Sequence, residues 1–169
     1  MACATVWKSV YGAVPHFLEA VALTIGLIHF YQGPLDEDKD FNPDFYDWNH
    51  VFVVYCDGAF FAGHRDMPAE INSTKLYFRG HRILVASLKD LLKTKGLNKA
   101  TDVIITGDSA GGMAAYYHAD EIKSMLPEST RFKAAPFSGI FLDRPYAVGE
   151  NFFAKQFKTI LTCRTAQTI

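Results

Sequence analysis

Residues 103–112, VIITGDSAGG, pass from a run of β-branched residues directly into a glycine-rich turn. A short apolar run bounded by turn residues is typical of a buried strand. The segment that follows, residues 111–126, is expected to form a helix. The turn itself has the pattern G-x-S-x-G, in which a serine occupies a sharp connection between a strand and a helix. The stretch therefore predicts a strand, an elbow and a helix in succession.

Ser109 is the candidate nucleophile of this elbow, and the reaction class that it indicates is acyl transfer. Gly107 and Gly111 stand two residues away on each side and relieve the crowding of a tight turn. The helix after the serine begins with free backbone N–H groups, of which that of Ala110 is the first. Such groups stabilise the negative oxygen of a tetrahedral intermediate. The alternative is a glycine-rich turn whose serine only caps the helix.

The other elements alternate in the same manner along the chain. Residues 51–55, VFVVY, predict a second strand buried on both faces, and residues 132–140 contain a third apolar run. Between the first two strands lies a helical segment that Gly96 can end. Its apolar residues at helical spacing are Tyr77, Leu84, Leu88, Leu91 and Leu92. Strands that alternate with helices predict an α/β protein with a parallel, helix-covered sheet.

The N-terminal part of the chain is less regular. Residues 17–31 are apolar but too short for a membrane span, and they carry Glu19 and His29. Residues 20–28 have the length of a signal-peptide core, yet Lys8 is the only lysine or arginine before them and no A-x-A-like site follows. We expect a buried helix here, with a signal peptide as the alternative. Residues 35–49, rich in Asp, Pro and Asn, are expected to form a surface loop.

Composition excludes several classes of protein. The 169 residues suffice for about one domain. Seventeen basic residues against eighteen acidic ones, with no basic cluster, argue against nucleic acid as a partner. The cysteines, at positions 3, 56 and 163, are too scattered for a zinc site or a disulfide framework.

A serine nucleophile needs a histidine as base and an acid to orient that histidine. The only histidine after Ser109 is His118, nine residues along the expected helix, which places it about 13 Å away and on the opposite face. The upstream His64 and His81, in a loop and on a helix, would reach the serine only through a topology that this fold does not normally use. The residues alone therefore identify no base.

The acidic residues near the elbow are not expected to complete the catalytic set. Asp108 adjoins the serine and is expected to hydrogen-bond local backbone. We expect Asp120, Glu121 and Asp143 to be solvated or loop-stabilising acids.

Six segments in a fixed order resemble the plant-type pectin acetylesterase family, whose animal relatives include the Notum carboxylesterases. The segments are residues 42–49 (NPDFYDWN), 51–63 (VFVVYCDGAFFAG), 76–83 (LYFRGHRI), 107–112 (GDSAGG), 118–121 (HADE) and 138–143 (SGIFLD). The resemblance covers more than half of the chain.

The resemblance implies an α/β-hydrolase-like serine esterase, with Ser109 as nucleophile, that removes O-acetyl groups from cell-wall pectin. The implied partner is acetylated pectin or a related polysaccharide, and the implied location is extracellular or in the cell wall. Neither a metal nor an organic cofactor is expected. Hormone-sensitive-lipase-like carboxylesterases also carry a GDSAGG elbow and form an alternative, although this chain lacks their upstream HGGG segment.

The chain also departs from the family's pattern. Family members have a glycine-rich oxyanion segment before the position of residues 42–46, and their catalytic Asp and His follow the position of residues 141–143. The family's disulfide pattern is mostly absent: Ala119 stands where plant members commonly have cysteine, and Cys56 is expected to have lost its disulfide partner. The resemblance thus implies an incomplete member, with a divergent segment at residues 1–34 and a partial, truncated α/β-hydrolase-like domain at residues 35–169. A catalytically silent remnant that at most binds a partner is the second function class.

Overall fold

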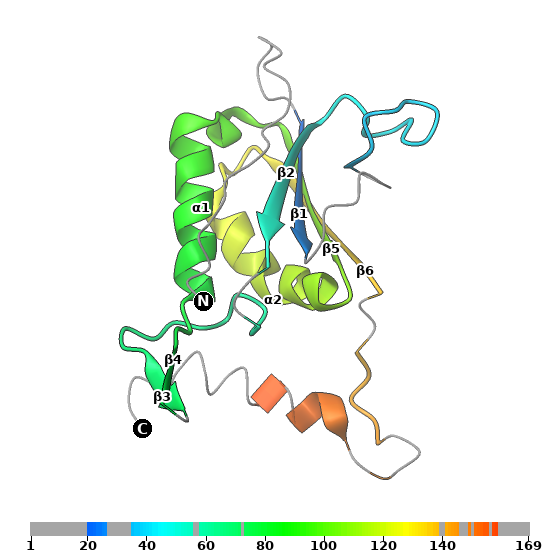
Figure 1. The fold of residues 1–169 in the computed structure, drawn as a ribbon. Helices are drawn as coiled ribbons and strands as arrows, with labels where there is room; N and C mark the ends of the chain where they lie inside the picture. The colour runs from blue at the N-terminus through cyan, green and yellow to red at the C-terminus, as the bar shows by residue number, and fades with distance from the viewer. Residues whose placement is uncertain are drawn as a thin grey trace.

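The computed structural model describes residues 20–26, 35–55, 58–71, 73–138, 141–145, 149, 151–155 and 157–158. The three cysteines, at positions 3, 56 and 163, lie outside these residues, as do residues 1–19 and 27–34 of the N-terminal segment. A parallel sheet of four strands forms the centre of the fold, in the order β2-β1-β5-β6 (Figure 1). Its strands are β1 (Ala20–Gly26), β2 (Asn49–Val54), β5 (Asp102–Asp108) and β6 (Arg131–Phe137).

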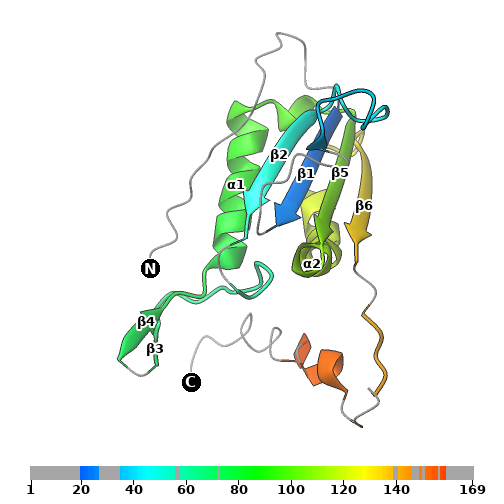
Figure 2. The ribbon, with the colours of Figure 1, turned by 45° about the vertical axis from the view of Figure 1, so that its right-hand side comes forward.

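Two helices connect these strands. Helix α1 (Gly80–Thr94) lies between β2 and β5 in the sequence, and α2 (Ala110–Met125) lies between β5 and β6. A short 3-10 helix, η2 (Leu97–Lys99), follows α1. The hairpin of β3 (Ala69–Ile71) and β4 (Thr74–Leu76), which the sequence did not predict, projects away from the sheet (Figures 1 and 2).

The strand order explains why both helices cover the same face of the sheet. Connections between parallel strands are right-handed. From β2 the chain crosses β1 to reach β5 and then continues in the same direction to β6. Successive right-handed connections in one direction place their helices on one side, and the core confirms this. Side chains of both helices pack against the same face of β1, β2 and β5.

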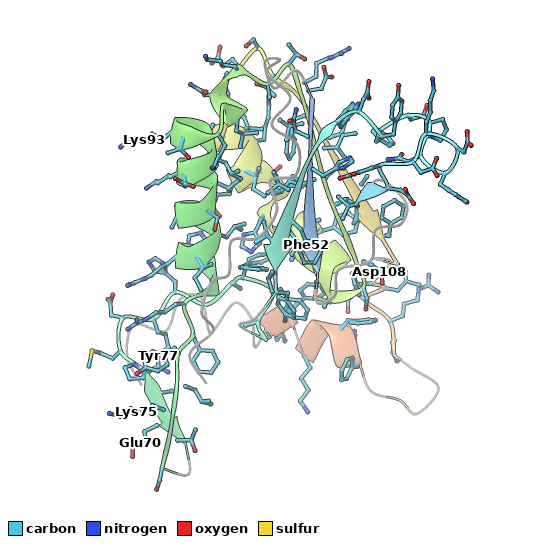
Figure 3. The ribbon with its side chains drawn as sticks, turned by 45° about the horizontal axis from the view of Figure 1, so that its top comes forward. Phe52, Glu70, Lys75, Tyr77, Lys93 and Asp108 are labelled. Carbon is cyan, nitrogen blue, oxygen red and sulfur yellow. The ribbon has the colours of Figure 1, made fainter. Side chains whose placement is uncertain are left out.

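The core lies between that face and the two helices. Its strand residues are Leu23, Ile25, Val51, Val53, Val103 and Ile105, and all of them are buried. Helix α1 contributes Leu84, Leu88 and Leu91, whose spacing puts them on one side of the helix, and Lys93 points away from the sheet (Figure 3). Each fully buried leucine stabilises the fold by about 1.5–3 kcal/mol through removal of apolar surface from water.

The N-terminal helix expected at residues 20–28 is wrong. Residues Ala20–Gly26 form β1, which pairs with β2 on one side and β5 on the other. Short apolar runs do not distinguish a buried helix from a central strand, because a strand covered on both sides shows no alternation. The residues before position 35 therefore include a strand of the same sheet.

The other strands and helices that the sequence predicts are confirmed with small shifts. Strands at residues 51–55 and 103–106 and a helix after residue 110 are all present, and Gly96 adopts a left-handed conformation just after α1. Tyr77 lies before α1 rather than in it. Pro136 is tolerated in β6 because β6 is at the edge of the described sheet. No helix in the described part of the chain has the length and hydropathy of a membrane span.

Candidate active site

The strand order places a topological switch point at the carboxyl ends of β1 and β5. From β1 the chain goes to β2 on one side, whereas from β5 it goes to β6 on the other. Open α/β sheets bind their ligands in the crevice outside the strands at such a point, because the connections diverge there. Ser109 directly follows β5, so it lies at this end of the sheet. Its neighbour Asp108, the last residue of β5, is labelled in Figure 3.

Ser109 occupies the elbow that the sequence predicts. Its φ of 52° and ψ of −110° lie in a region that residues other than glycine rarely adopt. A conformation of this kind costs about 1–3 kcal/mol and persists only where the surroundings impose it. Here the Ser109 N–H donates to the carbonyl oxygen of Phe137 at 3.1 Å, and its carbonyl oxygen accepts from the Met113 N–H at 3.0 Å. The side chain of Ser109 is exposed.

Gly107 is the residue that lets the elbow close. A Cβ at this position would lie 2.4 Å from the carbonyl carbon and oxygen of Gly111 and 2.7 Å from the carbonyl oxygen of Ile25. All three contacts are to backbone atoms, which cannot rotate aside. Gly107 therefore allows β1, β5 and the first turn of α2 to meet beneath the serine.

The first turn of α2 provides the candidate oxyanion donors. The first N–H groups of a helix have no acceptor within the helix and carry the positive end of its dipole. Helix α2 begins at Ala110, the residue after the serine, and Gly111 follows it. The geometry can therefore present backbone donors to an oxygen that becomes negative next to Ser109.

His118 has a structural role rather than one at the serine. It is completely buried, and its Nε2–H donates to the carbonyl oxygen of Phe60 at 2.8 Å. Burial lowers the pKa of His118 below its ordinary value, against the opposing effects of that hydrogen bond and of Glu121. The imidazole is therefore neutral at pH 7 and ties α2 to the loop after β2.

The upstream histidines also lie away from the elbow. His81 Nε2 lies 2.8 and 2.9 Å from the two carboxylate oxygens of Glu121, and His81 Nδ1 lies 3.3 Å from His64 Nδ1. Glu121 is twelve residues beyond Ser109 on the same helix, which corresponds to about 18 Å along its axis. His50 is bonded to the carbonyl oxygen of Phe45. Among the described residues, no histidine is placed to act as the base.

The structure agrees only in part with the roles that the sequence predicts for Asp120, Glu121 and Asp143. Glu121 is half-buried and bonded to His81, so the expectation of a solvated acid is wrong for this residue. That contact joins α1 to α2 across 40 positions of sequence, and no local pattern signals it. Asp143 accepts a hydrogen bond from Asn151, in agreement with a loop-stabilising role. Asp120 is exposed.

A parallel sheet with a strained serine between a central strand and a helix defines an α/β-hydrolase-like fold. The family model described as Pectinacetylesterase matches residues 28–169, and the chain belongs to this family. Pectin acetylesterase 11 of Arabidopsis thaliana is 36% identical over 140 residues, which cover 82% of this chain and 35% of that protein. Pectin acetylesterase 5 of the same plant is 40% identical over 119 residues, 70% of this chain and 27% of the relative.

Animal carboxylesterases are also similar. The palmitoleoyl-protein carboxylesterase Notum of Schmidtea mediterranea is 31% identical over 118 residues, 67% of this chain and 21% of that protein. The crystal structure of the Wnt deacylase Notum from Drosophila superposes with a TM-score of 0.66 at 23% identity, covering 86% of this chain and 52% of that one. The similarity to the Drosophila structure supports the assignment of the fold. The chain spans about a third or less of the length of these curated relatives.

The contacts of Gly107 lead to a prediction about stability. We expect Gly107→Ala to lower the free energy of unfolding by an amount at the upper end of the 1–3 kcal/mol that is roughly typical of overpacking, because the added methyl meets backbone on two sides. Gly58→Ala is the control. Its Cβ would meet no atom within 4 Å, and its φ of +66° costs only about 1–2 kcal/mol. Urea unfolding measures both, and an equal or smaller loss for Gly107→Ala would contradict this account.

The buried His118 leads to a prediction about pH. Its folded-state pKa is lower than its unfolded-state pKa of about 6.5, so the unfolded chain binds more protons. The free energy of unfolding should therefore decrease as the pH falls through about 6.5, and His118→Gln should flatten that decrease.

Urea unfolding between pH 7.5 and pH 5 is the measurement, with His50→Gln as the control. His81 and Glu121 face His118 and remain in both variants. Equal pH slopes for wild type and His118→Gln would show that His118 does not carry the effect.

Proposed function

We propose that this chain carries the nucleophile of a carboxylesterase that removes O-acetyl groups from pectin, with Ser109 as that nucleophile. The observation that supports the proposal most directly is the strained conformation of Ser109 between β5 and α2 at the switch point of the sheet. Such backbone strain lowers stability, so its presence at Ser109 supports a functional role for this residue. Membership of the pectinacetylesterase family supports the ester chemistry.

The higher sequence identity to the plant pectin acetylesterases favours an acetylated polysaccharide over an acylated protein as substrate. The two plant pectin acetylesterases are 36% and 40% identical to this chain, whereas the planarian palmitoleoyl-protein carboxylesterase is 31% identical. A polysaccharide substrate in turn implies an extracellular or cell-wall location, which we propose with it.

The proposed reaction proceeds in two acyl transfers. The Ser109 Oγ attacks the acetyl carbonyl carbon, and the oxygen that becomes negative is stabilised by backbone N–H groups at the start of α2, beginning with Ala110. The C–O bond to the sugar then breaks, and the sugar leaves as an alcohol after receiving a proton. Water attacks the acetyl-serine and releases acetate. Both steps need a base that accepts and returns a proton.

The described residues do not supply that base, and we propose that residues 1–169 on their own have little activity for this reason. We propose that this stretch contributes the nucleophile and part of the oxyanion hole. A silent member of the family that only binds acetylated polysaccharide is the second candidate, favoured by the absence of any described histidine near Ser109.

Residues 1–169 should show negligible esterase turnover. Without a base, the serine hydroxyl keeps an alcohol-like pKa, and loss of a triad member typically leaves only about 10³–10⁴-fold catalysis over water. The assay is hydrolysis of p-nitrophenyl acetate by wild type and by Ser109→Ala. We expect equal rates. A Ser109-dependent rate like that of ordinary esterases would mean that a histidine does reach the serine.

A chimera tests whether Ser109 is competent when partners are supplied. Residues 20–169 replace the corresponding segment of pectin acetylesterase 11, so that β1 stays with its neighbours β2 and β5. We expect acetate release from acetylated pectin that Ser109→Ala abolishes in the same chimera. A soluble, folded chimera that binds acetylated pectin without releasing acetate would favour the silent member instead.

A further inference from the structure

Two imidazoles face each other at the start of α1, away from Ser109. His64 lies in the loop before the β3–β4 hairpin, and His81 is the second residue of α1. Their Nδ1 atoms are 3.3 Å apart, and their rings meet edge to face, with centroids 5.2 Å apart and planes at 72°. The side chain of His64 is exposed and that of His81 is mostly covered. The pair is therefore reachable from solvent on one side.

The backbone fixes this arrangement from both sides of His64. The carbonyl oxygen of Gly63 accepts a hydrogen bond from the His81 N–H at 2.9 Å, and the Arg65 N–H donates to the carbonyl oxygen of Phe78 at 2.8 Å. A Cβ on Gly63 would lie 2.9 Å from the carbonyl carbon of Phe78, so only glycine permits this close approach. The loop that carries His64 is thus pinned to the residues that lead into α1.

Glu121 fixes the tautomer of His81. A carboxylate only accepts hydrogen bonds, so the Nε2 of His81, 2.8 Å from the nearer oxygen, carries the proton. In the neutral ring the lone pair is then on Nδ1, which is the atom that faces His64. A histidine whose second nitrogen donates to a carboxylate is the usual arrangement for a metal ligand, because the carboxylate orients the ring and raises its basicity.

We propose that His64 Nδ1 and His81 Nδ1 bind a divalent transition-metal ion, with Zn²⁺ as the representative. Zinc binds imidazole nitrogen at about 2.0–2.1 Å in tetrahedral geometry, which separates two ligand nitrogens by about 3.3–3.4 Å. The observed separation of 3.3 Å meets this requirement before any movement. The described residues contain no cluster of three or more ligand side chains, so water or a small anion completes the coordination.

The charges around the pair are compatible with a cation. Glu121 lies behind His81, and Asp66 interacts electrostatically with His64 while it is paired with Arg82. His118 is the other imidazole nearby. Its ring stacks on His81 at 6.0 Å, and its Nδ1 lies 3.6 Å from Glu121 Oε2. The alternative occupant of the space between the two Nδ1 atoms is a shared proton.

Metal titration of the 169-residue protein tests the proposal. ZnCl₂ is added at pH 7.5 and binding is followed by calorimetry, with Co²⁺ as a spectroscopic probe of the ligands. We expect one ion per chain and a tetrahedral Co²⁺ spectrum without the near-ultraviolet band that thiolate ligands produce. Bound zinc should also raise the melting temperature, because it binds only the folded state. Protons compete with the metal for the imidazole nitrogens, so the affinity should fall as the pH is lowered.

Matched variants identify the ligands. His64→Ala and His81→Ala should each weaken zinc binding at least tenfold, and His50→Ala, which alters a histidine elsewhere, should leave it unchanged. Glu121→Gln should weaken it about tenfold, since loss of such an outer partner typically costs 10–100-fold. His64 is exposed, so His64→Ala is the variant that should keep the fold intact, as circular dichroism would check. Absence of zinc binding, or binding unaffected by His64→Ala, would overturn the proposal and favour the shared proton.

Discussion

At Gly107 three backbone segments meet with no room for a side chain. The carbonyl oxygen of Ile25 in β1 and the carbonyl group of Gly111 in α2 both lie where a Cβ would project. This contact brings the first turn of α2 against the ends of two central strands. The strained conformation of Ser109 follows from it, because the chain must turn from β5 into α2 within a single residue. This strain costs stability, and it leaves the Ser109 hydroxyl exposed at the start of a helix.

Helix α2 carries two different environments along its length. Its first turn holds the serine elbow, whereas its second half holds His118 and Glu121, which face α1 and the loop after β2. The loop is itself strained, since Phe60 and Phe61 have φ values of 54° and 56°. The buried hydrogen bond from His118 to the Phe60 carbonyl holds that conformation in place. A polar seam of histidines and Glu121 therefore joins α1, α2 and the loop on the side remote from Ser109.

The seam and the elbow act independently in physical terms. About 18 Å of helix separates Glu121 from Ser109, and the two sites share no described side chain. The ester chemistry depends on the helix N-terminus and on a base, whereas metal binding depends on two imidazoles and a carboxylate. Changes in one site can therefore be measured without altering the other, provided that the fold is retained.

The sequence by itself determined the elements with strong local signals. The β-branched residues at positions 103–106, the glycines on either side of Ser109 and the leucine spacing of α1 are all local features, and they correctly predicted β5, the elbow and the helix. Six short segments between residues 42 and 143 also sufficed to identify the family, which the match over residues 28–169 confirms. The distance of His118 from the serine followed from helix geometry alone.

Only the tertiary structure decided the features that depend on distant partners. Residues Ala20–Gly26 form a strand because β2 and β5 offer their backbone hydrogen-bonding groups on both sides, and nothing in this seven-residue, mostly apolar segment specifies those neighbours. The contact of His64 with His81 spans 17 positions, and that of His81 with Glu121 spans 40. In the sequence, no local pattern connects these polar residues. They become a cluster because the right-handed connections place α1 and α2 side by side on one face of the sheet.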